Sequence, residues 1–387
     1  MVALLYLRRK AVLILAAAVA AVTLAACDIP IGGGPLINTT RAVPVALLVP
    51  SSSPNGAALA QSLENAARLA VGDLESVDID LRIYDTGGTP DGAAEAAAAA
   101  LDEGASIFIG PLFAEAAASA GRVAASRGVN VLTFSNNPAI AGGNVFLLGN
   151  TFQTSADRLA RYAVQQGKGS VYVVHAQDQA EELGRDAIQR ALSANGGSLA
   201  GVSSFPLSQE GVINEIPNIA SGYRGSGASS IFVTSGSAGA LPFLAALLPE
   251  NGIDADAAQF IGLQRLDVPS SALSLKGLQG AWFAAPAPDR SARFNARYQS
   301  AFGTLPSPVA GLAYDGIAAV GALVAQGNSN ALGRDALTQG QGFAGVYGPF
   351  RFFPNGTNQR GLAVAQIQNN QVIVIDPAPR SFGGAGF

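Results

Sequence analysis

Side chains that could act as nucleophiles or general bases are scarce in this chain. It holds one histidine and one cysteine, which excludes a zinc ribbon, an iron–sulfur cluster and an intrachain disulfide. His175 is the single candidate for histidine catalysis, and Asp178 follows it three residues later. A Ser–His–Asp site would also need a nucleophile turn such as Gly-x-Ser-x-Gly, which the sequence lacks. We therefore predict that the protein is not an enzyme and that His175 lies in a loop or at the rim of a cleft.

Glycine-rich and acidic segments give no sign of a cofactor. Residues 166–170 and 225–227 are rich in glycine, but each precedes an expected strand rather than a helix, which is the wrong order for a phosphate or dinucleotide site. The carboxylates of Asp85, Asp91 and Asp102 are distributed over different elements and are typical of solvated helix caps. We predict no metal and no cofactor.

The composition restricts the class of protein further. The chain has 387 residues, of which 49% are hydrophobic and 13% charged, so it is long and apolar enough for one large or two medium domains. Its net charge is −4, and no basic cluster occurs after residue 10. Nucleic-acid binding normally needs a basic patch or domain, so we predict no nucleic-acid partner.

The N-terminal residues read as a targeting signal. Basic residues 8–10 precede an uncharged apolar run over residues 11–26, which is short for a membrane span but suits a secretory signal. The run ends in Leu-Ala-Ala-Cys, which resembles the lipobox of bacterial lipoproteins. This resemblance implies a signal peptide over 1–26, lipidation at Cys27, and an anchor on the periplasmic side of the bacterial cell envelope, on either the inner or the outer membrane. The alternative is a plain signal peptide with a chance cysteine.

After a flexible tether at residues 27–42, strand-like and helix-like segments alternate. Short continuous apolar runs are typical of buried parallel strands, and amphipathic segments between them are typical of covering helices. Strands are expected at residues 45–49, 79–84, 106–109, 130–134, 171–174, 202–205 and 230–233, and helices at 57–74, 91–101, 113–126, 155–165, 181–193 and 212–221.

The C-terminal part departs from this alternation. Helices are expected at 291–302 and 308–325, followed by strands at 347–353, 362–368 and 372–375. The last two strands flank a hairpin-like turn at residues 369–371. A chain that returns to an earlier lobe at its end would produce this order.

Several short motifs occur in an order and spacing that match a known family. They are Ile109-Gly110-Pro111, Asn130-Val131-Leu132-Thr133 with Ser135-Asn136-Asn137-Pro138, Ser170 to His175 with Gly184, Leu312-Ala313-Tyr314-Asp315-Gly316, and Val346-Tyr347-Gly348-Pro349-Phe350 with Asn355-Gly356. Over residues 43–376 the chain resembles the type I periplasmic binding proteins of the leucine/isoleucine/valine-receptor type. The resemblance implies two Rossmann-like α/β lobes with parallel sheets, three crossings between them and a ligand cleft that closes by hinge motion.

The resemblance also implies a division into lobes. We assign residues 43–152 with 285–342 to the first lobe, 153–284 with 343–376 to the second, and 377–387 to a C-terminal tail. Ligands of open α/β sheets bind outside the carboxyl ends of the strands. The cleft candidates chosen on this basis are Ser52, Ser53, Asp85, Leu112, Ser135, Asn136, Asn137, His175, Ser235 and Gln264.

The amino-acid site of the family is altered at two aligned positions. Receptors of this type carry a glutamate for the ligand ammonium where this chain has Gln264, and a cleft tyrosine where it has Leu183. We therefore expect weak binding of free leucine, isoleucine and valine. If the alignment is shifted by a few residues, Asp267 is the alternative partner of the ammonium.

Two functions fit the resemblance. The turn at residues 110–112 and the segment 132–136 also resemble penicillin-binding-protein activators, lipoproteins that are thought to regulate peptidoglycan synthases. We place this reading first, with a penicillin-binding protein as the partner. The alternative is the substrate-binding lipoprotein of an amino-acid or amide ABC transporter, with a permease as the partner and a small-molecule ligand.

Overall fold

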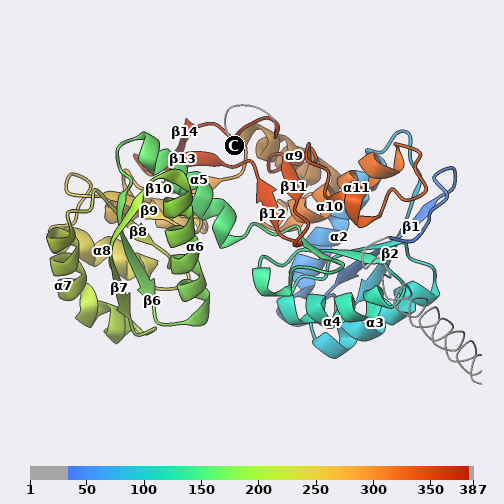
Figure 1. The fold of residues 1–387 in the computed structure, drawn as a ribbon, viewed down its shortest axis with the longest axis horizontal. Coiled ribbons are helices and arrows are strands. Elements are labelled where there is room, and N and C mark those ends of the chain that lie inside the picture. The colour runs from blue at the N-terminus through green and yellow to red at the C-terminus, as the bar shows by residue number, and fades with distance from the viewer. Residues whose placement is uncertain (1–33, 383–387) are drawn as a thin grey trace, which may run out of the picture.

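The structure is a computed structural model that describes residues 34–382, in which the chain forms two α/β lobes side by side (Figure 1). The predictions for the signal peptide 1–26, for Cys27 and for the last five residues of the tail lie outside the described residues. Among residues 34–382 no helix is both long and apolar enough to cross a membrane.

The first lobe is built on a five-stranded parallel sheet with the order β2-β1-β3-β4-β5. Its strands are β1 (Val43–Val49), β2 (Ile79–Asp85), β3 (Ile107–Ile109), β4 (Asn130–Thr133) and β5 (Val145–Leu147). Because successive side chains of a strand point to opposite faces, Val45, Leu47 and Val49 join one hydrophobic core and Ala46 and Leu48 join another. Helices α2 (Ala57–Gly72) and α10 (Ala310–Val324) cover the first face, and α3 (Pro90–Asp102) and α4 (Ala114–Ala125) cover the second.

The second lobe is built on a seven-stranded sheet with the order β14-β13-β10-β9-β8-β6-β7. The strands β6 (Ser170–Ala176), β7 (Ser198–Phe205), β8 (Ser230–Val233), β9 (Gln259–Gly262) and β10 (Trp282–Ala285) are parallel, whereas β13 (Ala363–Gln368) and β14 (Gln371–Asp376) are antiparallel additions. Helices α5 (Phe152–Gln165) and α6 (Gln179–Asn195) cover one face, and α7 (Gln209–Ser226) and α8 (Leu241–Glu250) cover the other. The hairpin expected before β14 is present, with Asn369 and Asn370 both at positive φ.

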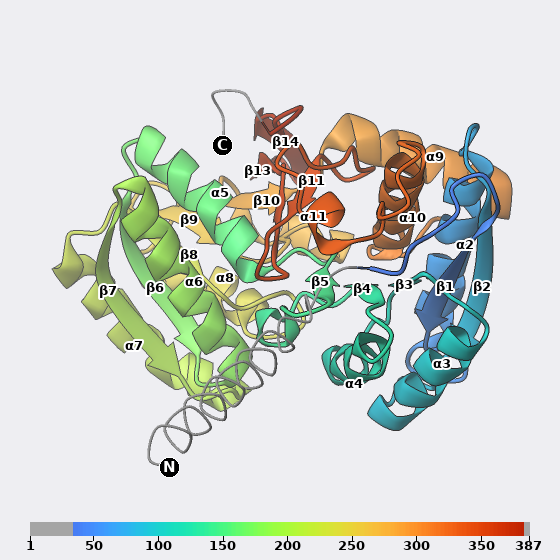
Figure 2. The same cartoon turned by 45° about the vertical axis from the view of Figure 1, so that its right-hand side comes forward.

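Three connections link the lobes, at residues 148–151, 286–287 and 361–362. Between the second and third, the chain runs through α9 (Pro288–Phe302), α10, α11 (Arg334–Leu337), β11 (Phe350–Phe352) and β12 (Asn358–Arg360). Figure 2 shows α10, α11 and β11, in orange and red, between the sheet of the second lobe and strands β1 and β2 of the first.

The packing moves one boundary expected from the sequence. Residues from 343 onward were assigned to the second lobe, but Phe343, Phe350 and Phe352 are buried in the same core as β1 and α10. The return to the second lobe therefore occurs at β13. The aromatic hairpin β11–β12 closes the first lobe before the chain crosses.

Most of the alternating elements lie where the sequence predicts them. Elements for which the sequence analysis gave no range include β5, α8, α11 and β12. β5 and β12 have three residues each, too few for a clear periodicity, and α8 contains Pro249 and is apolar on most of its surface. Hydrophobic periodicity is informative only in segments of greater length and clearer amphipathicity.

Candidate functional site

A cleft of about 680 Å³ lies between the lobes, beside the three connections. Both lobes and the connections contribute to its walls, which contain Leu59, Leu112, Phe113, Ala114, Phe134, Ser135, Asn136, Asn137, Gly149, Asn150, Phe152, Ser155, Ser237, Leu263, Gln264, Arg265, Val268, Ala284, Pro286, Pro308, Val309, Leu312, Tyr347, Arg360 and Leu362. The volume is in the range of pockets that bind small organic molecules.

The first-lobe wall includes the loops that follow β3 and β4, together with residues of α2 and of the start of α10. The turn after β3 requires glycine, because Gly110 has a φ of +92° and an added Cβ would lie 2.2 Å from the carbonyl oxygen of Leu48. The loop after β4 is fixed by its own polar groups: Ser135 Oγ accepts a hydrogen bond from Asn137 N at 3.2 Å, and Asn137 Oδ1 accepts one from Ala139 N at 3.0 Å. This wall therefore presents uncharged polar groups among the phenyl rings of Phe113 and Phe134.

The wall formed by the second lobe contains a charged residue, Arg265, directly after Gln264 in the sequence. Gln264 donates a hydrogen bond from Nε2 to the carbonyl oxygen of Thr234 at 2.9 Å. Arg265 forms a two-pronged pair with Asp267, from Nε to Oδ1 at 2.6 Å and from Nη2 to Oδ2 at 2.5 Å. The third guanidinium nitrogen, Nη1, has no hydrogen-bond partner among the described residues.

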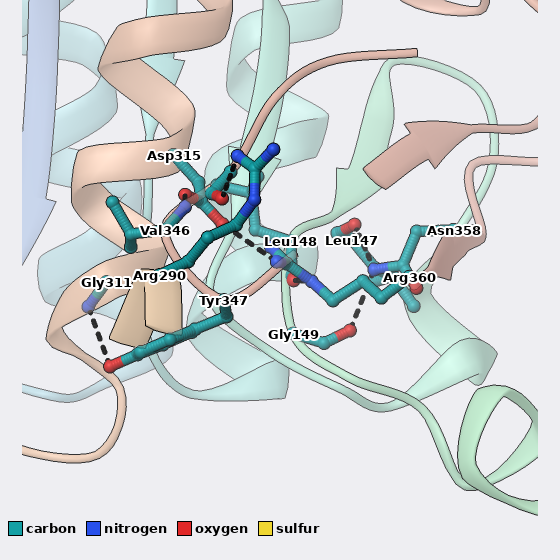
Figure 3. A network of polar contacts seen from close by, with 11 residues as sticks. Leu147, Leu148, Gly149, Arg290, Gly311, Asp315, Val346, Tyr347, Asn358 and Arg360 are labelled. Carbon is teal, nitrogen blue, oxygen red and sulfur yellow. Dashed lines mark hydrogen bonds and ion pairs between the residues drawn. The ribbon is translucent and has the colours of Figure 1, made fainter. Parts of the chain in front are cut away.

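The hinge end of the cleft is held by a buried ion pair, shown in Figure 3. Arg360 reaches from β12 to Asp315 on α10, with Nη1 and Oδ2 2.8 Å apart, and both side chains are almost fully buried. Burial raises the pKa of the Asp315 carboxyl, and the charge and hydrogen bond of Arg360 oppose that rise. Arg360 also donates from Nε to the carbonyl oxygen of Leu148 at 3.0 Å, and its guanidinium lies 4.7 Å from the centre of the Phe350 ring.

Two further hydrogen-bonding side chains lie near this ion pair. Asn358 donates to the carbonyl oxygens of Leu147 and Gly149 at 2.7 and 2.8 Å, so β12 is bonded to the end of β5 and to the first connection (Figure 3). Tyr347 accepts a hydrogen bond from the backbone N–H of Gly311 at 3.2 Å, and burial raises the pKa of its phenol to about 12. Most polar side chains of the hinge thus bond within the chain, whereas Nη2 of Arg360 and Oδ1 of Asn150 are buried without a hydrogen-bond partner among the described residues.

Five of the residues predicted from the sequence line the cleft. They are Leu112, Ser135, Asn136, Asn137 and Gln264. Their place in the wall makes these side chains accessible to a ligand. That they contact a ligand stays a prediction.

Three predicted residues at the ends of β1 and β2 do not line the cleft. Ser52 and Asp85 are exposed, and the Asp85 carboxylate accepts hydrogen bonds from the backbone N–H groups of Ser52 and Gly87. Ser53 lies in the same turn. Hydrogen bonds from the side chain of Ser52 and from backbone N–H groups lower the pKa of Asp85 although its partial burial opposes this. These residues are absent from the cleft wall, and the Asp85 carboxylate instead stabilises the turns that follow β1 and β2.

His175 and Ser235 are buried and do not line the cleft, rather than being exposed at its rim. His175 is 4% exposed, and its Nδ1 lies 2.8 Å from the carbonyl oxygen of Ala176. Ser235 donates its hydroxyl to the Glu181 carboxylate at 2.7 Å. Asp178, the residue spaced for a pair with His175, instead caps α6 by accepting from Ala180 N and Glu181 N.

Glu181 is the buried acid of this region that the sequence analysis missed. Its Oε2 accepts hydrogen bonds from Ala176 N at 2.6 Å and from the Thr234 hydroxyl at 2.9 Å, in addition to the bond from Ser235. The carboxylate ties the ends of β6 and β8 together and is absent from the cleft wall. The sequence places Glu181 in the first turn of a predicted helix. It does not indicate the hydroxyl groups that bond to the carboxylate, because Thr234 and Ser235 follow a different strand.

The hinge residues Arg360 and Tyr347 were also missed as parts of the cleft wall. Tyr347 and Asp315 belong to motifs that carry the family resemblance, but nothing in their spacing indicates that Arg360 pairs with Asp315.

No group of three or more His, Cys, Asp or Glu residues that could hold a metal ion is found within the described part of the chain. Among the residues that line the cleft, arginine is the only charged type.

Comparisons with known proteins agree with this architecture. The family model described as periplasmic binding protein matches residues 42–371. No curated protein matches the chain.

Several solved structures share the fold at low sequence identity. A branched-chain amino-acid ABC transporter periplasmic ligand-binding protein from Burkholderia xenovorans is 17% identical, with a TM-score of 0.71 over 88% of this chain and 97% of that one. An ABC transporter substrate-binding protein from Sphaerobacter thermophilus is 19% identical, with a TM-score of 0.70 over 90% and 100%. A solute-binding protein of an ABC transporter from R. palustris, in complex with benzoate, is 16% identical, with a TM-score of 0.60 over 90% and 99%.

Proposed function

Because the chain belongs to the periplasmic binding protein family, whose members bind ligands and are not enzymes, we propose that it is the solute receptor of an ABC transporter. Its ligand would be a small organic molecule held between the lobes, and its partner would be the permease of that transporter. The observation that carries the proposal is the 680 Å³ cleft, to which both lobes and the connections contribute side chains. Rotation about three short connections would close such a cleft around a ligand.

The structures reported above support a transporter role through the names of those proteins. Their names describe receptors for branched-chain amino acids or for an aromatic acid. The activator role that the sequence analysis placed first has no support among them, and no described feature of the chain favours it. We therefore place the receptor role first.

The receptor role can be tested by a ligand screen with a matched pair of variants. Thermal shift would be measured for the purified protein against amino acids, amides, aromatic acids and muropeptides. A ligand present at a hundred times its dissociation constant stabilises a protein by about 2.7 kcal/mol. Ser237→Trp fills the cleft and should abolish the shift, whereas Ser52→Trp lies at an exposed turn and should preserve it. A thermal shift that survives Ser237→Trp would place the ligand outside the cleft. If the protein binds only muropeptides or a penicillin-binding protein, the activator role would be supported instead.

We also propose that the receptor is held at the membrane by lipid on Cys27. The lipobox-like run before this residue supports the anchor, and Cys27 is the only cysteine of the chain. Cys27→Ser should move the protein from the membrane fraction to the soluble periplasmic fraction, as followed by immunoblotting. Unchanged membrane association would rule out this anchor.

A further inference from the structure

We infer that the ligand of the cleft is a carboxylate with an apolar body and no ammonium group, and that Arg265 Nη1 is the group that binds the carboxylate. This inference rests on the receptor function proposed above and names the substrate class of the same site. It follows from the charges that the cleft presents and from the hydrogen bonds that are already formed around them.

A ligand ammonium would find no free carboxylate in this cleft. No aspartate or glutamate lines it. Glu181 is 8% exposed and accepts hydrogen bonds from three groups of its own lobe. Asp315 is fully buried and paired with Arg360. Only neutral acceptors such as Gln264 and Asn150 remain, and these cannot balance a desolvated positive charge.

Asp267 does not fill this role either. Both of its oxygens are engaged by Arg265, and its side chain is 14% exposed. An ammonium would have to displace a guanidinium that binds through two parallel hydrogen bonds, which is among the strongest geometries for a carboxylate. The alternative considered for a shifted alignment is therefore disfavoured.

The cleft does offer an unused cationic donor. Arg265 lines the cleft, its side chain is 39% exposed, and Nη1 makes no hydrogen bond among the described residues. Its charge also acts across the cleft, because it opposes the rise in the pKa of Tyr347 on the other side. The guanidinium of Arg360 is less suited, because its unpartnered Nη2 is buried.

The remaining walls fit an apolar body. Phe113 and Phe134 come from the first lobe, Phe152 begins α5, and Leu263 and Val268 come from the second lobe. Asn136 lines the same cleft and makes no side-chain hydrogen bond among the described residues, so it can meet a second polar group of the ligand. An aliphatic or aromatic acid of this kind would place its charge at Arg265 and its body among these side chains.

The test compares ligands that differ only in charge and variants that differ only at the Arg265–Asp267 pair. Dissociation constants of 4-methylpentanoate, leucine and 3-methylbutylamine, and of benzoate, benzamide and benzylamine, would be measured by calorimetry on the full chain carrying Cys27→Ser. We expect the acids to bind at least tenfold more tightly than the amino acid, the amides or the amines.

Two variants separate the effect of the Arg265 cation on binding from the effect of the Asp267 carboxylate that balances it. Asp267→Asn leaves the guanidinium charge unbalanced and should tighten binding of the acids severalfold. The double variant Arg265→Gln, Asp267→Asn keeps the pair neutral without the cationic donor and should weaken binding of the acids by about ten- to a hundredfold. Circular dichroism of both variants controls for folding.

The outcomes distinguish this inference from the receptor function. Leucine binding as tightly as 4-methylpentanoate, and weakened by Asp267→Asn, would overturn the inference while the receptor function stands. Binding of a solute from the wider screen but of none of the six compounds would do the same. Failure of every solute in that screen to bind would instead remove the receptor function itself.

Discussion

The hinge and the cleft are adjacent regions, and each contains an arginine that is paired with an aspartate. The two arginines differ in how deeply they are buried. At the hinge, Arg360 is 4% exposed, its partner Asp315 is fully buried, and Arg360, Asp315 and Asn358 bond to surrounding backbone. In the cleft, Arg265 is paired with a partner that is only partly buried and keeps one nitrogen without a bond. Each guanidinium keeps one nitrogen without a hydrogen bond among the described residues, but Nη2 of Arg360 is buried, whereas the side chain of Arg265 is 39% exposed and lines the cleft. The buried arginine therefore stabilises the fold, and the exposed one is accessible to a ligand.

The largest expected effect is the loss of the hinge arginine. Arg360→Met would leave Asp315 buried without its ion-pair partner, which typically costs about 3–5 kcal/mol of the free energy of unfolding. Arg265→Met, in the cleft, should cost less than about 1 kcal/mol, because its pair is partly exposed to solvent. Denaturant unfolding measures both.

A matched double variant checks the cause of this difference. Asp315→Asn with Arg360→Met removes both charges and keeps an acceptor for the N–H of Val346, which bonds to Asp315 Oδ1. Most of the stability should return. Equal losses for Arg360→Met and Arg265→Met would contradict the distinction between hinge and cleft.

An intermediate effect is expected from alkaline pH at the hinge. The pKa of Tyr347 is raised from its usual 10 to about 12, so the folded protein favours the neutral phenol. The resulting stabilisation is complete below pH 10 and is lost as the pH rises through 12, and it corresponds to about 2–3 kcal/mol. Melting temperatures between pH 9 and 12 should fall less steeply for Tyr347→Phe than for the natural sequence. Parallel slopes for the two proteins would show that this phenol does not contribute.

The smallest expected effect comes from adding an acid to the cleft. Gln264→Glu would place a carboxylate beside Arg265, which should weaken binding of 4-methylpentanoate and strengthen binding of leucine, each by about tenfold, or 1.4 kcal/mol. Gln264→Met is the matched control, because it keeps the length of the side chain without charge. A loss of both ligands in Gln264→Glu alone would indicate a disturbed wall rather than an electrostatic effect.

The sequence predicted the fold better than the site, for reasons that individual residues illustrate. The apolar run that became β1 and the amphipathic segment that became α2 carry local periodicity, which needs no knowledge of distant residues. The cleft loops at Leu112 and Ser135–Asn137 were found because strand ends in parallel sheets meet at one edge.

The errors at the site arise where contacts between distant segments decide the role of a residue. Ser235 follows a strand as expected, yet Glu181 on α6 draws its hydroxyl into a buried network. Ser52 and Asp85 also follow strands, but the Asp85 carboxylate accepts hydrogen bonds from the backbone of the adjacent turns and neither residue lines the cleft. The ion pair between Asp315 and Arg360 joins residues 45 positions apart, and no local pattern connects them.

Closure of the lobes on a ligand is the central claim, and fluorescence energy transfer between them tests it most directly. With Cys27 replaced by serine the chain contains no cysteine, so Glu95→Cys on α3 and Ser193→Cys on α6, both exposed, can each carry a dye. Addition of a saturating carboxylate ligand should change the transfer efficiency in the protein with an intact cleft and should leave it unchanged when Ser237→Trp is added. An efficiency that stays constant at saturation in the intact protein, or that changes equally in both proteins, would contradict the account.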